Sequence, residues 1–148
     1  MLDKKHLIYS AVYGILMRNN EVLLLRRFNT GYKDGFFTLP AGHIEKDELP
    51  KGTMFRELKE ETGLICDIES IIPVHAMYRI GDSGRTYVDY YFKISKYDGD
   101  PENKESKKCD HIDWYDIENI PDNTLLHVKT ALNFIKNKIP ISEIREIN

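Results

Sequence analysis

The sequence predicts one domain that combines α-helices with β-strands, of the α+β or α/β class. Three observations lead to this prediction. A chain of 148 residues is long enough for one sizeable core and short for two. Segments with strand-like alternation lie both before and after one strongly helical segment, and a second helical segment follows the last of them. This order predicts a mixed sheet between helical layers.

The first half of the chain is predicted to begin with a hairpin. Residues 7–16 and 22–25 have the apolar and β-branched composition of strands, and the polar residues 18–21 between them form the turn. Residues 26–35 then form a loop, since they are polar and contain two glycines. Residues 36–40 return as an extended segment that leads into the helix.

The strongest helical segment spans residues 49–62. Pro50 is suited to a first helical turn, and Gly63 is suited to a left-handed cap after the last turn. The apolar face of this helix is expected to consist of Met54, Phe55 and Leu58.

The second half of the chain predicts further strands and the closing helix. The expected strands are residues 68–74, 76–80, 85–95 and 111–115. Residues 81–84 form a turn, and residues 99–108 form a polar loop. Residues 125–138 have the apolar spacing of an amphipathic helix, and the last eight residues are expected to fray.

An acidic cluster lies on the first helix and has the clearest functional content. Glu57, Glu60 and Glu61 are spaced i, i+3 and i+4, so the other two carboxylates are neighbours of Glu57 on one side of the helix. Like charges at this spacing repel, and a hard divalent cation between them would relieve the repulsion. The alternative is an ordinary solvated helix of mixed charge, which is what most such segments are.

The longer segment around this cluster resembles a complete Nudix box, the signature of the Nudix hydrolases. Gly42 is followed by Glu48 and then by residues 56–64, Arg-Glu-Leu-Lys-Glu-Glu-Thr-Gly-Leu, at the spacing of that motif. The resemblance covers residues 7–138. It implies an α/β fold, the Nudix α/β/α sandwich with a mixed β-sheet, in a single domain over residues 1–148. Residues 29–43 and 103–109, with Trp114, are similar to a bacterial MutT-like subgroup.

The resemblance also implies roles for the acidic residues. Mg²⁺ or Mn²⁺ would be held mainly by Glu57 and Glu61, with Glu60 sharing ions or waters and the Gly42 carbonyl as a backbone ligand. The catalytic base would be Glu57, Glu60 or Glu105, which lies in the later loop. The Arg56 guanidinium can hold carboxylates in a fixed orientation by forked hydrogen bonds, and we expect it to support the site together with Glu48.

Candidate substrate contacts are less specific. Arg26 and Arg27 end a predicted strand, where they either clamp phosphates or are simply solvated. Aromatic side chains either stack on a base or belong to the core. The substrate-binding candidates from these groups and from the helix entry are Arg26, Arg27, Tyr32, Tyr78, Trp114 and Asn123.

Composition limits the partners. A net charge of −3 and an isoelectric point near 6.0 lack the basic stripe of a binder of long DNA or RNA. Cys66 and Cys109 have no metal-type spacing and predict small core residues in a reduced cytoplasm. The sequence has no apolar run of membrane-spanning length, so a soluble monomer or homodimer without membrane partners is expected.

The sequence therefore predicts a magnesium-dependent hydrolase that converts a nucleoside triphosphate or related nucleotide to a monophosphate and pyrophosphate. The enzyme alternative is an ADP-ribose or nucleotide-sugar pyrophosphatase. The alternative of another class is a nucleotide sensor without turnover, against which the full acidic cluster argues.

Overall fold

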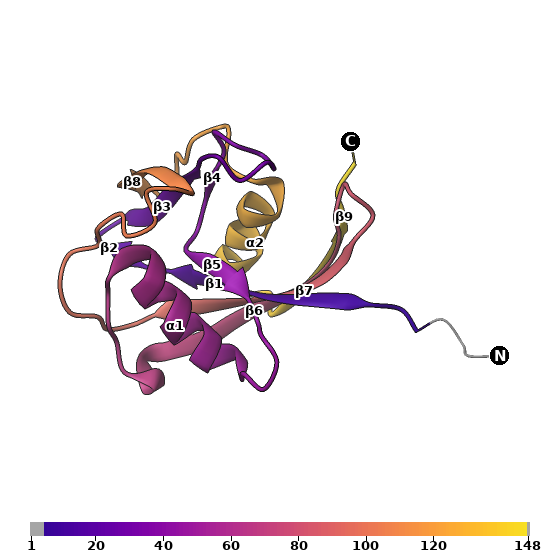
Figure 1. Ribbon diagram of the computed structural model, residues 1–148, viewed down its shortest axis with the longest axis horizontal. Coiled ribbons are helices and arrows are strands. Elements are labelled where there is room, and N and C mark those ends of the chain that lie inside the picture. Colours follow the sequence, from indigo (N-terminus) through magenta and orange to yellow (C-terminus); the bar gives the residue numbers. More distant parts are fainter. Residues whose placement is uncertain (1–4, 148) are drawn as a thin grey trace.

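The computed structural model describes residues 5–147 and is built around a five-stranded mixed sheet (Figure 1). Its strands, in spatial order, are β5 (Ala41–His43), β1 (Ile8–Ile15), β7 (Thr86–Ile94), β6 (Ile71–Ile80) and β9 (Ile141–Arg145). Strand β1 runs parallel to β7, and β9 runs parallel to β6, while the other pairs are antiparallel. The expected mixed sheet is confirmed.

A second, smaller sheet stands beside the first. It consists of β2 (Met17–Arg18), β3 (Glu21–Arg27), β4 (Phe37–Thr38) and β8 (Cys109–Asp116). All of its pairs are antiparallel, and β3 has β8 on one edge and the short strands β2 and β4 on the other. The two sheets place the ends of β3 and β5 near the same helix, which is where the acidic cluster lies.

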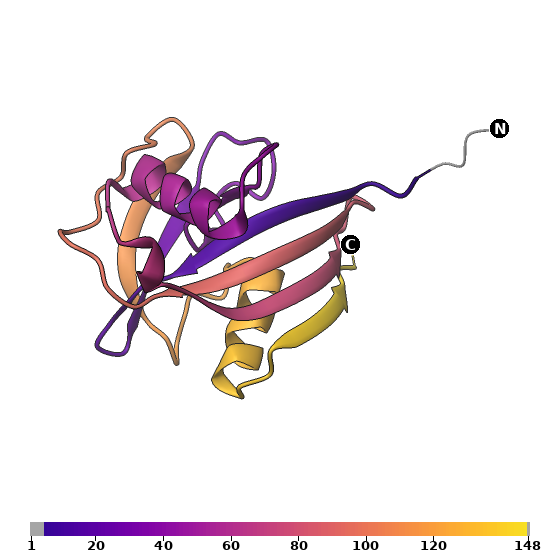
Figure 2. The same cartoon turned by 90° about the horizontal axis from the view of Figure 1, so that it is seen from below.

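Two helices cover opposite faces of the larger sheet (Figure 2). Helix α1 (Pro50–Thr62) packs on one face through Met54 and Leu58, which are fully buried with Val12 and Phe92. Helix α2 (Leu126–Lys136) packs on the other face. Its Val128 and Ala131 are buried in the same cluster as Tyr13, Met77 and Tyr91. These layers confirm the predicted α/β fold and its sandwich arrangement.

Helix α1 begins and ends where local chemistry predicts. Pro50 occupies the first turn, where a missing backbone N–H costs nothing. Gly63 ends the helix in the left-handed conformation, with φ of 76°, and its N–H donates to the Lys59 carbonyl. The predicted bounds 49–62 therefore agree with the structure, and Leu49 is the N-cap.

The predicted hairpin of residues 7–16 and 22–25 is wrong. Strand β1 pairs with β5 and β7, and β3 pairs with β8, so the two segments belong to different sheets. The turn itself is present, because Asn19 adopts a φ of 56° and joins β2 to β3. The chain changes sheets at Leu16, which is fully buried between them.

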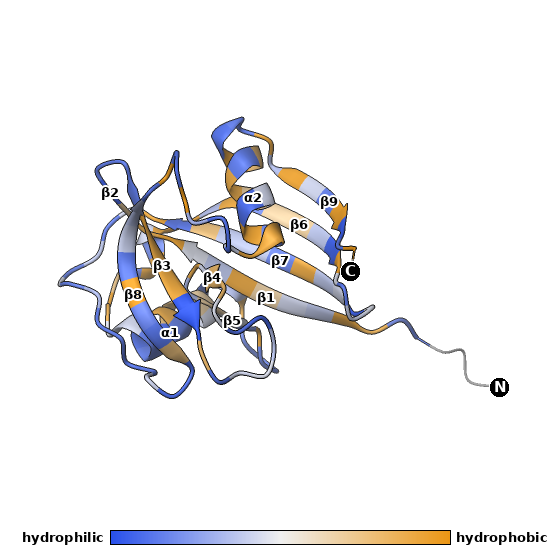
Figure 3. Cartoon of the chain, turned by 90° about the horizontal axis from the view of Figure 1, so that it is seen from above, coloured by the Kyte–Doolittle hydropathy of each residue, from blue (hydrophilic) through white to orange (hydrophobic). Residues whose placement is uncertain are grey.

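The strand boundaries in the second half also needed correction. Residues 68–70 form a 3-10 turn, and β6 runs from Ile71 without a break, with a bulge between Pro73 and His75 in place of the expected gap. Ile141–Arg145 form strand β9 and do not fray as predicted, while residue 148, the last of the segment expected to fray, lies outside the described residues. Strand β9 lies along the edge of β6 (Figure 3). Within residues 5–147, no helix is long and apolar enough to cross a membrane.

Candidate active site

A polar cleft of about 960 Å³ opens beside helix α1. Its walls come from α1, from β3 and the loop after it, from the β6–β7 turn and from the start of β8. Six acidic side chains line it: Glu45, Glu57, Glu60, Glu61, Asp82 and Glu105. A second groove of about 460 Å³ beside α2 is lined mainly by apolar side chains and has Glu118 as its one acidic lining residue. The first cleft therefore holds the chemistry.

Gly42 lies against Glu57 at the back of this cleft. It is the middle residue of β5 and pairs with Val12 of β1, so it sits in a strand and makes no turn. A Cβ atom added to Gly42 would overlap the carboxyl group of Glu57. The glycine is therefore required for space.

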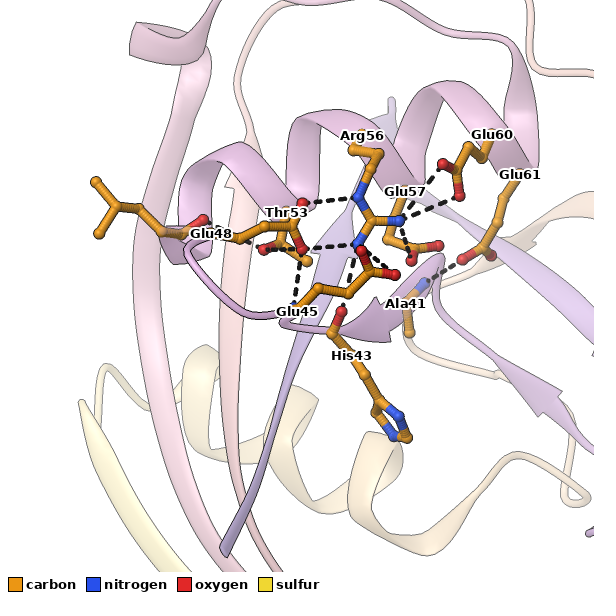
Figure 4. Close-up of polar contacts among 10 residues, drawn as sticks. Ala41, His43, Glu45, Glu48, Thr53, Arg56, Glu57, Glu60 and Glu61 are labelled. Atoms are coloured by element: carbon orange, nitrogen blue, oxygen red, sulfur yellow. Dashed lines mark hydrogen bonds and ion pairs between the residues drawn. The ribbon is translucent and has the colours of Figure 1, made fainter.

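Arg56 is the hub of the acidic cluster (Figure 4). Its Nε and Nη2 atoms donate to the two oxygens of Glu48 at 2.7 and 2.9 Å, which is the forked geometry expected. Its Nη1 donates to Glu57 Oε1 at 2.8 Å and reaches Glu60 at 3.3 Å. The guanidinium lowers the pKa of Glu48 to about 2. Glu48 also accepts hydrogen bonds from Thr53 and from the Glu45 N–H, so it anchors Arg56.

Glu61 is the most deeply placed of the acids, with 9% of its surface exposed. Its Oε1 accepts a hydrogen bond from the Ala41 N–H at 3.1 Å, which ties the end of α1 to β5. Burial, followed by the charge of Glu57, raises the pKa of Glu61 well above its usual value. Arg56 makes no contact with Glu61, so this carboxylate lacks a neutralising cation.

Glu57 has a similar environment, moderated by Arg56. Burial raises its pKa, and the hydrogen bond from Arg56 opposes that rise. Glu105 adds to the negative potential, since its charge is among the causes that raise the pKa of Glu61. Among residues 5–147, no three His, Cys, Asp or Glu side chains already stand in a metal-binding arrangement. The buried Glu61 and the partly buried Glu57 nevertheless form a donor set of hard oxygens that suits a divalent cation.

The two arginines predicted at the end of β3 line the cleft, and both already have partners. Arg26 Nε donates to Asp110 at 2.7 Å. Arg27 donates to the Tyr32 carbonyl at 2.8 Å and to the Thr30 hydroxyl at 3.0 Å. Tyr32 also lines the cleft.

The other three predicted substrate contacts do not line the cleft. Tyr78 alternates with the buried Arg79 on β6 and lies on the opposite face of the sheet. The Trp114 ring packs under the Arg18 guanidinium, 4.6 Å from its centroid. Asn123 donates its side-chain N–H to the Gly35 carbonyl, which fastens two loops together.

A second polar cluster on the cleft wall was not found from the sequence. Arg79 donates to Asp89 at 2.7 Å and reaches Glu146 at 3.4 Å. His127 bridges Glu146, at 2.8 Å, and the Tyr13 hydroxyl, at 3.1 Å. The available signal was Arg79 in β6 and Asp89 in β7, charged residues in two strands made mainly of apolar and aromatic residues, although β7 also carries Lys93.

Comparisons with known proteins agree with this geometry. A family model described as the NUDIX domain matches residues 8–137. The chain is 30% identical over 139 residues to the ADP-ribose pyrophosphatase of Methanocaldococcus jannaschii, a match that covers 91% of this chain and 80% of that protein. It is 29% identical over 97 residues to the 8-oxo-dGTP diphosphatase of Escherichia coli K12, covering 66% and 73%.

Solved structures are similar in fold. The MutT NUDIX hydrolase from Burkholderia pseudomallei superposes with a TM-score of 0.79 at 19% identity, covering 86% of this chain and 98% of that one. The MutT protein from Methanosarcina mazei gives a TM-score of 0.77 at 20% identity, with 93% and 98% covered. At these identities the similarity concerns the fold.

Proposed function

This chain belongs to the Nudix family, and from that premise we propose that it is a metal-dependent pyrophosphohydrolase that splits the diphosphate linkage of a nucleotide and releases a nucleoside monophosphate. The observation that carries the proposal is the pair of acids on α1, of which Glu61 is buried and Glu57 partly buried. Both line a large polar cleft, and within residues 5–147 Glu57 forms an ion pair with Arg56 while Glu61 forms none. A purely structural cluster has little reason to keep uncompensated buried charge.

The acidic cluster is suited to a divalent cation, which Nudix hydrolases generally use. Glu57 and Glu61 would be the principal ligands, Glu60 would share ions or waters, and the Gly42 carbonyl would complete the protein ligands. When bound, Mg²⁺ or Mn²⁺ neutralises phosphate oxygens and lowers the pKa of a bound water.

The side chains around the ligands would orient them and accept a proton. Arg56 holds Glu57 in place and is itself held by Glu48. We propose that Glu60 or Glu105 accepts the proton of the attacking water, because Glu57 has a short hydrogen bond from Arg56 and packs against Gly42. Glu60 is 47% exposed, and Glu105 enters the cleft from a separate loop, so both are accessible to water.

Two substrate classes follow from different observations. The similarity of residues 29–43 and 103–109 to MutT-like proteins favours a nucleoside triphosphate, cleaved to a monophosphate and pyrophosphate. The match to an ADP-ribose pyrophosphatase, which extends over more of the chain, favours ADP-ribose or a nucleotide sugar. A nucleoside monophosphate is a product in both cases.

The deciding experiment is a substrate panel with product analysis. Purified protein is incubated with Mg²⁺ and then Mn²⁺ against ordinary and oxidised nucleoside triphosphates, ADP-ribose, nucleotide sugars and dinucleoside polyphosphates. A monophosphate with pyrophosphate from a triphosphate identifies the first class, and a monophosphate from ADP-ribose identifies the second. Tight binding of one compound without any turnover would contradict the hydrolase proposal and indicate a sensor.

A further inference from the structure

The mouth of the cleft is bridged by a contact between two segments far apart in sequence. The Tyr32 hydroxyl donates to Asp82 Oδ1 at 2.7 Å, across a separation of 50 residues. Lys33 Nζ lies 3.4 Å from the other oxygen of Asp82. Tyr32 belongs to the loop after β3, and Asp82 belongs to the β6–β7 turn. Both residues line the cleft that holds the acidic cluster, so the contact spans it.

The loop that carries Tyr32 is held as a preformed unit. The Asp34 carboxylate accepts hydrogen bonds from the N–H groups of Thr30 and Gly31 at 3.0 Å, and from the Thr30 hydroxyl at 2.6 Å. Arg27 clasps the same loop through the Tyr32 carbonyl and Thr30. The backbone coils tightly, with left-handed φ at alternate positions: Asn29, Gly31, Lys33 and Gly35. The loop therefore presents the tip of Tyr32 from a fixed base.

The tyrosine and lysine ends of the bridge are exposed to solvent, while its acidic end is partly covered. Tyr32 is 41% exposed and the Lys33 side chain is 40% exposed, whereas the Asp82 side chain is 14% exposed. Water competes for hydrogen bonds at such positions, and surface ion pairs contribute little to stability. The hydrogen bond from Tyr32 lowers the pKa of Asp82, which keeps Asp82 an ionised acceptor at neutral pH. The hydrogen bonds that Arg27 and Asp34 make within the Tyr32 loop do not involve Asp82, so they can persist when the Tyr32–Asp82 bond breaks.

We propose that Tyr32 and Asp82 form a latch across the cleft, closed in this structure, that opens to admit substrate and whose closure limits the length of the substrate that fits. This inference rests on the proposed function, because it makes both residues determinants of substrate access and size. Tyr32 then acts through Asp82, and neither residue takes part in the chemistry. Compact nucleotides fit beneath the closed latch, while substrates with a second bulky group compete with it.

The first test needs no substrate. Hydrogen exchange measured by mass spectrometry reports on residues 28–36 and 81–85 in the parent, in Tyr32→Phe and in Asp82→Ala. We expect each variant to raise exchange in both segments, by about threefold or more. The matched control is Tyr78→Phe, since Tyr78 is also 41% exposed but lies outside the cleft. Exchange that rises only in the segment carrying each substitution would overturn the latch.

The second test uses turnover and separates the latch from the chemistry. For Tyr32→Phe we compare kcat/KM for a dinucleoside polyphosphate with kcat/KM for a compact nucleotide. We expect the ratio of the first to the second to rise about 2- to 10-fold, the range for loss of one exposed hydrogen bond. The double variant Tyr32→Phe/Asp82→Ala should show less than the sum of the two single effects, because both changes break the Tyr32–Asp82 hydrogen bond, although Asp82→Ala also removes the ion pair with Lys33. Additive effects, or an unchanged ratio, would overturn the proposal. If no compound is hydrolysed, the proposed function fails, and the exchange test still decides whether the two loops are coupled.

Discussion

Two charged clusters line the same cleft and differ in how their charges are balanced. In the first, Arg56 faces Glu48, Glu57 and Glu60, while within residues 5–147 no cation forms an ion pair with Glu61. In the second, Arg79 pairs with both Asp89 and Glu146, and Glu146 also meets His127. The first cluster therefore leaves one buried acid without an ion-pair partner, while each acid of the second has one.

The difference separates binding chemistry from structural support. Every polar member of the second cluster has a partner, and no buried side-chain N or O atom among residues 5–147 lacks a hydrogen bond. The first cluster is satisfied geometrically but not electrostatically, since burial raises the pKa of both Glu57 and Glu61. An added cation stabilises a buried acid that has no ion-pair partner, whereas a network in which each acid already has a partner gains nothing from an added cation.

The largest expected effect comes from breaking the second cluster. Arg79→Met leaves Asp89 buried without its main partner, since the two side chains are 6% and 0% exposed. We expect the free energy of unfolding to fall by about 3–5 kcal/mol, the usual cost of leaving a buried charge unpaired. Chemical denaturation followed by circular dichroism measures this change.

Two controls make that result specific. Arg79→Met combined with Asp89→Leu should recover part of the loss, because the unpaired charge is then removed as well. Lys136→Met breaks the exposed ion pair with Glu118, in which both side chains are 63% exposed, and should cost less than about 1 kcal/mol. If breaking the buried pair and breaking the exposed pair lower the free energy of unfolding equally, the contrast drawn between the two clusters is wrong.

The opposite behaviour is expected for Glu61→Gln. The amide oxygen still accepts the Ala41 hydrogen bond, and removal of a buried uncompensated charge does not lower stability. Activity should nevertheless fall by about 100-fold or more, since mutation of a residue that only supports a metal ligand already lowers activity about 10- to 100-fold. The measurement is kcat/KM at saturating magnesium, with thermal unfolding as the check on folding. If the folded variant is as fast as the parent, Glu61 is not a metal ligand.

Arg56→Lys is expected to have a smaller effect on the same site. Lysine keeps the positive charge but loses the forked hydrogen bonds to Glu48 and the separate bond to Glu57. We expect kcat/KM to fall by about 10- to 100-fold. Arg18→Lys is the control, because Arg18 is a 53% exposed arginine far from the carboxylates in the fold. If lysine at position 56 supports full activity, charge alone and not orientation is what Arg56 supplies.

How much of the fold was predictable depended on how local its determinants are. The bounds of α1 follow from Pro50 and Gly63, which act within one turn of the helix. The pairing of β1 with β7 is set by contacts about 80 residues apart, so the sequence suggested a local hairpin with β3 instead. Strand β9 was missed because Ile141 is 72% exposed and the free edge of β6 decides its pairing.

The candidate site also divides into features set by local spacing and features set by long-range contacts. Glu57, Glu60 and Glu61 share one helix, so their spacing alone placed them together. The second cluster brings Tyr13, His127 and Glu146 from distant segments to Arg79 and Asp89 of the β6–β7 hairpin, and no local pattern connects these segments. Tyr32, which was predicted as a substrate contact, lines the cleft, but its hydroxyl partner, Asp82, is visible only in the folded chain.

The smallest expected effect concerns the pH dependence of the second cluster in the metal-free protein. Burial by itself would raise the pKa of Glu146, but the hydrogen bond and charge of His127, with the charge of Arg79, lower it overall. A carboxyl whose pKa is lower in the folded state stabilises the fold above its unfolded pKa of about 4.3, and this stability is lost as the pH falls through the folded value. The difference in unfolding free energy between the parent and Glu146→Gln should therefore shrink as the pH falls below about 4. Glu118→Gln, at an exposed position, should leave the parent profile unchanged. A difference that stays constant down to pH 3 would mean that Glu146 contributes by packing and not by its charge, and the contrast between the two clusters would then rest on Arg79 and Asp89 alone.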